Sequence, residues 1–159
     1  MSSRIVYPKV APRAFRAMLG LEECIHDCGL EASLLELVKI RASQINGCAY
    51  CLDMHSKDAR AAGVTEQRLY LLDAWREAPF YSQRERAALS WTEALTLVAD
   101  NHVPDEIYNE ARQHFSEQEL VNLSLAVIAI NGWNRLAIAF RSEAGTYQAG
   151  MVTTLMNKG

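Results

Sequence analysis

The stretch that decides the fold is ELVKIRASQINGCAYCLDMH, which runs from Glu36 to His55. It joins two segments of helical apolar periodicity through the breaker Asn46-Gly47, and after the break it carries Cys48, Cys51 and His55. Side chains at positions i, i+3 and i+7 project from one face of a helix. The spacing therefore predicts that two thiols and an imidazole meet at one place near the start of a helix.

Helical patterns continue on both sides of this stretch. A helix is predicted from Pro12 to the stop at Gly29, with Cys24 and Cys28 on its buried apolar stripe. Three serine-glutamate pairs have the spacing of a capping box, which opens a helix: Ser33 with Glu36, Ser82 with Glu85, and Ser116 with Glu119. No segment has the period-two alternation of a strand, so the sequence predicts an all-α fold.

The longest predicted helix runs from Glu117 to about Arg141 and is apolar nearly all round in its first half. This pattern predicts burial at the centre of the domain or in a subunit interface. The polar Asn131, Asn134 and Arg135 in its second half are expected to tie it to a neighbouring element. The tail from Gly145 has no helical pattern and is expected to be loosely ordered or used in assembly.

Length and charge limit the classes of function. The chain has 159 residues and a net charge of −3, from 16 basic and 19 acidic side chains. It suits a single domain over residues 1–159 with its core at about 12–142. The absence of a basic run or basic amphipathic helix argues against binding to nucleic acid or an anionic membrane.

The apolar run from Leu120 to Ile130 is shorter than the roughly 20 residues that cross a bilayer, and the N-terminus lacks the apolar core of a signal peptide. We therefore expect a soluble cytoplasmic protein. Disulfide frameworks are rare in that reducing compartment, so four cysteines point to catalysis or metal binding.

Cys48 and Cys51 suit a dithiol redox centre. A free thiol has a pKa of about 8.5 and needs help to ionise at neutral pH. The amides of the first helical turn favour a thiolate at Cys48, and His55 lies one turn from Cys51, where it could accept the thiol proton. The pair could then reduce a peroxide through a sulfenic acid and a disulfide, or exchange with a partner's disulfide.

Two alternatives remain open on spacing alone. Cys48, Cys51 and His55 could bind zinc with Cys24 or Cys28 as the fourth ligand, or the cysteines could be buried structural residues. Glu36 has a structural role available in its capping box, and the break at Asn46-Gly47 prevents a sequence argument that it reaches Cys51.

These residues resemble the AhpD-type alkylhydroperoxidases of the carboxymuconolactone decarboxylase superfamily. The likeness rests on Glu36, eleven intervening residues, Cys48-Ala49-Tyr50-Cys51 and His55, and on a second segment, INGWNR, from Ile130 to Arg135. The resemblance implies an AhpD-like helical bundle assembled into trimers or hexamers. It also implies that Cys51 attacks, Cys48 forms the disulfide, His55 accepts the proton, and Glu36 acts as a relay through water or histidine.

Tyr50 is a departure, because the best-studied type has a histidine immediately before the second cysteine. Tyr50 is thus a candidate relay group, but a phenol titrates near a pKa of about 10.

The function implied is reduction of alkyl hydroperoxides, or of the disulfide of a partner peroxiredoxin, in antioxidant defence. Electrons would come from an external dithiol such as the lipoyl group of a lipoyl-bearing protein, with no bound cofactor or metal. Two other functions stay open: a carboxymuconolactone decarboxylase-like lyase, since that branch shares the fold without depending on a cysteine pair, and a dithiol sensor without turnover.

Overall fold

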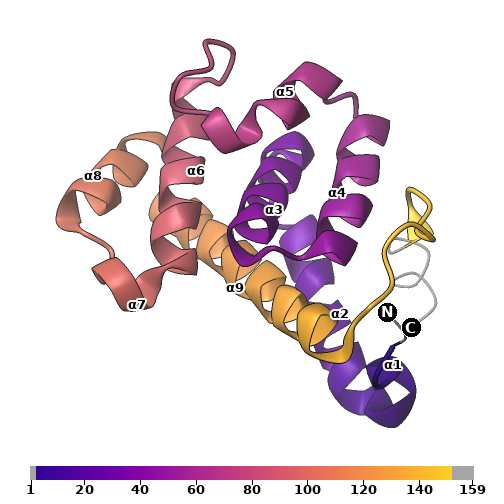
Figure 1. The fold of residues 1–159 in the computed structure, drawn as a ribbon. Coiled ribbons are helices and arrows are strands. Elements are labelled where there is room, and N and C mark those ends of the chain that lie inside the picture. Colours follow the sequence, from indigo (N-terminus) through magenta and orange to yellow (C-terminus); the bar gives the residue numbers. More distant parts are fainter. Residues whose placement is uncertain (1–2, 152–159) are drawn as a thin grey trace.

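The structure is a computed structural model and describes residues 3–151. Within that range the chain forms nine α-helices and one 3-10 turn, and no strand (Figure 1). The elements are α1 (Tyr7–Val10), α2 (Pro12–His26), α3 (Ala32–Asn46), α4 (Ala49–Ala61), α5 (Glu66–Tyr70), η1 (Leu72–Ala74), α6 (Gln83–Thr96), α7 (Val98–Asn101), α8 (Asp105–His114) and α9 (Glu117–Phe140). The all-α prediction is confirmed.

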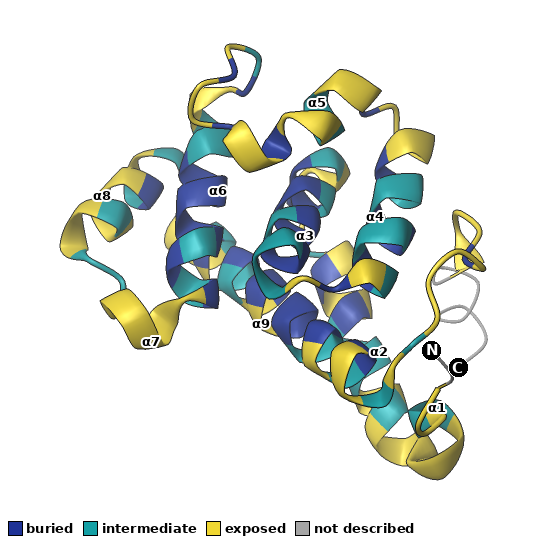
Figure 2. Cartoon of the chain, viewed as in Figure 1, coloured by how far each residue is buried: buried dark blue, intermediate teal, exposed yellow. Residues whose placement is uncertain are grey.

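Helix α3 is the centre of the bundle, where it packs against α4, α6 and α9. Buried residues concentrate on α3, α6 and α9 (Figure 2). One core cluster joins Val38 of α3 to Trp91 of α6 and Val127 of α9, and a second joins Leu37 of α3 to Ala59 of α4 and Leu72 of η1. Because α3 contributes to both clusters, its orientation fixes that of α4, which carries the cysteine pair.

Two of the three predicted capping boxes are confirmed. Ser82 and Ser116 each accept a hydrogen bond from the backbone N–H of the glutamate three residues on, and that glutamate accepts one in return. The box at Ser33 and Glu36 is wrong. Glu31 is the N-cap residue, two residues before Ser33, and helix α3 begins at Ala32, so Ser33 lies inside the helix. This leaves the Glu36 carboxylate free for another partner.

The predicted break between α3 and α4 is confirmed. Gly47 ends α3 in the left-handed region, with φ of 67°, and Cys48 then serves as the N-cap residue of α4. A residue with a side chain is strained at that φ, so glycine makes the sharp turn possible. The turn brings α4 back along α3 (Figure 1).

The prediction that Cys24 is buried is wrong, because its side chain is exposed; Cys28 is half-buried. The buried face of α2 instead contains Glu22 and Ile25. Glu22 tolerates burial because Lys39 of α3 forms an ion pair with it. The sequence prediction treated Glu22 as exposed, and it therefore placed Cys24 on the buried face of the helix.

Helix α9 has 24 residues and is long and apolar enough, by length and composition alone, to cross a membrane. The helix is longer than the apolar run from Leu120 to Ile130 on which the sequence prediction was based. The core helix of a soluble protein passes the same test, and α9 packs against α2, α3, α6 and α8.

Asparagine side chains join the end of α3 to α9, as predicted. Asn46 Nδ2 donates to Asn131 Oδ1 at 3.0 Å and to Asn134 Oδ1 at 2.9 Å, and Asn134 Nδ2 donates to Ser43 Oγ at 3.0 Å. Arg135 differs from the prediction, because its Nη1 hydrogen-bonds to Asn131 of its own helix.

The chain after α9 lies against α4, and its Tyr147 side chain is buried there. The described part of this tail is thus held to α4 at Tyr147, while its other residues from 145 to 151 are exposed; residues 152–159 lie outside the described range.

Candidate functional site: a dithiol at the wall of a cavity

The two cysteines of the decisive stretch are in contact. Cys48 Sγ and Cys51 Sγ lie 2.7 Å apart, and Cys48 Sγ also accepts a hydrogen bond from the backbone N–H of Cys51 at 3.4 Å. Both residues are only 1% exposed. The thiols thus meet as the spacing predicts, but they are enclosed by the protein.

A cavity of about 490 Å³ reaches Cys51 but not Cys48. Its size is within the range of small-molecule sites. Cys48 lies behind Cys51 in a cluster with Ala42 and Ile130. The cavity wall is mostly apolar and aromatic, and it includes Tyr7, Phe15, Leu19, Leu35, Tyr50, Met54 and Trp133.

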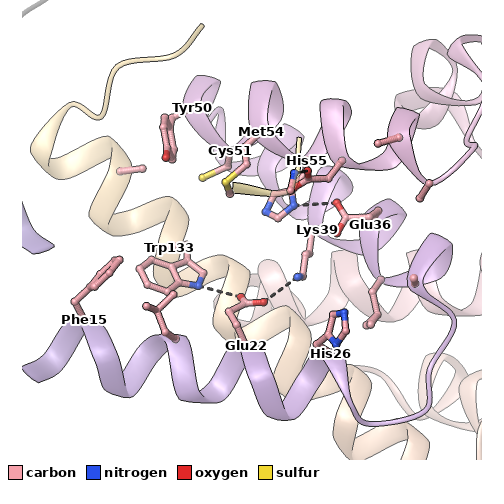
Figure 3. Close-up of a pocket in the computed structure, with 18 of the residues that line it drawn as sticks. Phe15, Glu22, His26, Glu36, Lys39, Tyr50, Cys51, Met54, His55 and Trp133 are labelled. Carbon is pink, nitrogen blue, oxygen red and sulfur yellow. Dashed lines mark hydrogen bonds and ion pairs between the residues drawn. The ribbon is translucent and has the colours of Figure 1, made fainter. Parts of the chain in front are cut away.

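His55 and Glu36 form a hydrogen-bonded pair on the same cavity (Figure 3). His55 Nδ1 lies 3.0 Å from Glu36 Oε2, and the His55 ring lies between Cys51 and Glu36. A carboxylate accepts the Nδ1 proton, so in the neutral ring the lone pair is on Nε2. Glu36 therefore reaches His55 directly and orients it as a base.

The electrostatics keep Glu36 ionised. Burial alone would raise the pKa of Glu36, but the hydrogen bond from His55 and the positive charge of Lys39 outweigh it, so the pKa is lowered. A charged Glu36 is a strong acceptor for the hydrogen bond from His55 Nδ1.

A second buried pair lies across the cavity. Lys39 Nζ is 2.8 Å from Glu22 Oε2, and Trp133 Nε1 donates to Glu22 Oε1 at 2.9 Å (Figure 3). Burial lowers the pKa of Lys39, but Glu22 and Glu36 together raise it, so the ammonium stays charged. The sequence reasoning missed this pair, although a lysine three residues after Glu36 on a buried helix was a usable signal.

The two thiols differ in acidity. The hydrogen bond from the Cys51 thiol lowers the pKa of Cys48 to about 7, and the Cys51 backbone amide acts in the same direction. That same hydrogen bond, with burial, raises the pKa of Cys51. The dithiol therefore loses its first proton near neutral pH and holds the second between the two sulfurs.

Tyr50 also lines the cavity. Burial raises the pKa of Tyr50, and a negative charge on Cys51 raises it further. The phenol stays protonated at neutral pH, so Tyr50 can donate a proton but is a poor base.

The metal alternative is not supported by the arrangement of ligands. Within residues 3–151, the one group of three candidate ligands with atoms within 4.8 Å of one another is Glu36, His55 and Asp58, and it contains no cysteine. The proposed zinc set of both cysteines and His55 with Cys24 or Cys28 is not assembled.

Comparisons with known proteins identify relatives of this chain. A model of the carboxymuconolactone decarboxylase family matches residues 12–94. The chain is 44% identical over 146 residues to the uncharacterized protein YdfG of Bacillus subtilis, which covers 92% of this chain and 99% of that protein. The alkyl hydroperoxide reductase AhpD of Bradyrhizobium diazoefficiens is 32% identical over 69 residues, 43% of this chain and 35% of that protein.

A crystal structure from Agrobacterium tumefaciens has the same fold, with a TM-score of 0.89 at 44% identity, over 92% of this chain and 100% of that one. It is described as a protein of unknown function and a candidate antioxidant defence protein AhpD.

Proposed function

Because the chain belongs to the carboxymuconolactone decarboxylase family, whose AhpD-like members include peroxidase-related enzymes, we propose that it is a thiol-dependent peroxidase acting on organic hydroperoxides. The observation that carries the proposal is the position of Cys51 in the cavity wall, with Cys48 in contact behind it. The attacking sulfur thus faces the substrate, and the second sulfur is in place to form the disulfide.

The thiolate arises within the pair. With one proton lost, the remaining proton lies between sulfurs 2.7 Å apart, and its transfer from Cys51 to Cys48 puts the negative charge on the sulfur that faces the cavity. His55 is the second acceptor for that proton, oriented by Glu36.

The reaction then proceeds in two steps. The Cys51 thiolate attacks the terminal oxygen of the hydroperoxide; an S–O bond forms and the O–O bond breaks. The alkoxide leaves as an alcohol by taking the proton that Cys51 gave up, which returns from Cys48 or His55 and leaves Cys48 as the thiolate. The Cys48 thiolate next attacks the sulfenic sulfur of Cys51, forming the disulfide and releasing hydroxide, which is protonated to water. An external dithiol, such as a lipoyl group, returns two electrons.

Burial of the sulfurs favours a small or slender substrate over a protein. At 1% exposure, the two cysteines are less accessible to a disulfide that is fixed on the surface of a partner such as a peroxiredoxin. A lipoyl arm, by contrast, is slender enough to enter a cavity of about 490 Å³. The proposed setting is the reducing cytoplasm, where free thiols persist.

A thiol count tests the function. In a Cys24→Ser, Cys28→Ser background, one equivalent of cumene hydroperoxide should remove two titratable thiols per chain, and dihydrolipoamide should restore them. Cys48→Ser should instead accumulate a sulfenic acid that dimedone traps, and Cys51→Ser should not react. Retention of both thiols would contradict a peroxidase and favour the lyase alternative. Loss and recovery without turnover would favour a sensor.

A further inference from the structure

The segment that follows α9 reaches the rim of the cavity. Residues 142–151, which we call the strap, run alongside α4 (Figure 1). Gly150 of the strap lines the cavity although it is exposed to solvent, so it lies at the rim. Cys51 and His55 line the same cavity from α4.

The strap is held by a few polar contacts with α4. Gly145 N donates to Asp53 Oδ2 at 3.0 Å, and Lys57 Nζ donates to the carbonyl oxygen of Tyr147 at 3.0 Å. The strongest set is at Asp58, whose carboxylate accepts from Tyr147 Oη at 2.8 Å and from Gly150 N at 3.0 Å. Hydrogen bonds to a charged group are roughly twice as strong as neutral ones.

Most of the strap is exposed to solvent. From residue 143 to 151 only Tyr147 is buried, and the other side chains are exposed. Segments with few buried apolar contacts and exposed backbone hydrogen bonds open locally at much lower free energy than the whole domain unfolds. Gly145 and Gly150 lie on either side of the buried Tyr147 in the sequence. Their φ values of 100° and 84° are ones that glycine adopts easily and other residues do not.

We propose that the strap is a gate on the cavity, hinged near Gly145 and latched by the hydrogen bonds from Tyr147 and Gly150 to Asp58. Opening moves Gly150 away from the rim and admits wider molecules to Cys51. Asp58 is suited to this role because it lies one helical turn after His55 and itself lines the cavity. The gate would thus set the size of the hydroperoxide or dithiol that reaches the thiol.

Alkylation of Cys51 by reagents of two sizes tests the gate. The gate rests on the proposed function only in that Cys51 is treated as the reacting residue. The experiment needs no peroxide, so a protein without peroxidase activity can still show the gate. In the Cys24→Ser, Cys28→Ser background, peptide mapping gives the rates for iodoacetamide and for fluorescein maleimide. Tyr147→Phe should raise the ratio of the maleimide rate to the iodoacetamide rate roughly tenfold, a factor that corresponds to about 1.4 kcal/mol.

The matched control is Thr146→Ala, since Thr146 is exposed and adjacent; it should leave the ratio unchanged. An unchanged ratio in Tyr147→Phe would overturn the gate. Hydrogen exchange of the wild-type protein is a second measurement. The amides of Gly145 and Gly150 should exchange faster than those of α9, and equal protection would mean that the strap does not open.

Discussion

At the scale of single residues, the shared proton of Cys48 and Cys51 has a measurable consequence. The pKa of Cys48 is about 7, below the reference of about 8.5 for a free thiol. Since the thiolate appears as pH rises through the pKa, one thiolate per chain should form with a midpoint near pH 7. Absorbance at 240 nm in the Cys24→Ser, Cys28→Ser background measures it. Cys51→Ala removes the side-chain donor and should move the midpoint upward; a midpoint unchanged in that variant would contradict the shared proton.

His55 should influence the reactivity of Cys51. His55→Ala removes the base on the cavity side, so the pH profile of Cys51 alkylation should move to a higher apparent pKa. Glu36→Gln should act in the same direction but less, because a neutral amide still accepts the Nδ1 hydrogen bond without supplying its charge. His102→Ala, on the exposed end of α7, serves as the control. Identical curves for wild type and His55→Ala would reduce His55 to a structural histidine.

At the scale of the helices, the asparagine contacts between α3 and α9 hold the turn that carries Cys48. Asn134 is fully buried, and Asn134→Ala leaves Asn46 and Ser43 each short of a partner. An unsatisfied buried polar group costs about 1–3 kcal/mol, so the free energy of unfolding in urea should fall by about that amount. Asn109→Ala, at an exposed site of α8, should change it by less than about 0.5 kcal/mol. Equal effects of the two variants would show that the contacts carry no stability.

The helices themselves follow from local patterns, and the pairing of distant side chains does not. Gly47 and the serine caps at Ser82 and Ser116 act on their own neighbours, so the sequence predicts them correctly. Glu36 satisfied a local motif, yet it bonds to His55 across two helices. Its true partner depends on the angle between α3 and α4, which spacing does not encode. The contact of Cys48 with Cys51 was predictable because the two lie one turn apart at the start of a single helix.

The same limit applies to Glu22 and Lys39. Each is a charged residue that the sequence alone predicts to be exposed. They are buried because the packing of α2 near α3 lets them form an ion pair. The strap escaped prediction for a related reason, since it has no periodicity and its hydrogen bonds go to side chains of α4.

At the scale of the whole molecule, α9 presents an apolar stripe to solvent. Val121, Leu125 and Ile128 are 59%, 36% and 57% exposed and follow helical spacing along one face. We expect this stripe to be covered in a homo-oligomer, with a trimer or hexamer as predicted from the sequence. Ile128→Lys would place a charge in the contact and should lower the mass measured by light scattering to that of the monomer, 17.8 kDa.

Tyr70→Lys is the matched control, because Tyr70 is 75% exposed on α5 and away from the stripe. It should leave the assembly intact. A monomeric wild-type protein at micromolar concentration would argue against the interface.

The indole of Trp133 gives the protein an optical reporter of its own. Its ring packs edge-on against Phe15 in the cavity wall, and its N–H is bound to the buried carboxylate of Glu22. The other two tryptophans, Trp75 and Trp91, belong to the two core clusters away from the cysteine pair. Emission from a Trp75→Phe, Trp91→Phe protein would therefore come from the cavity alone, and it should change in real time when a molecule enters or when the sulfurs change their state of oxidation.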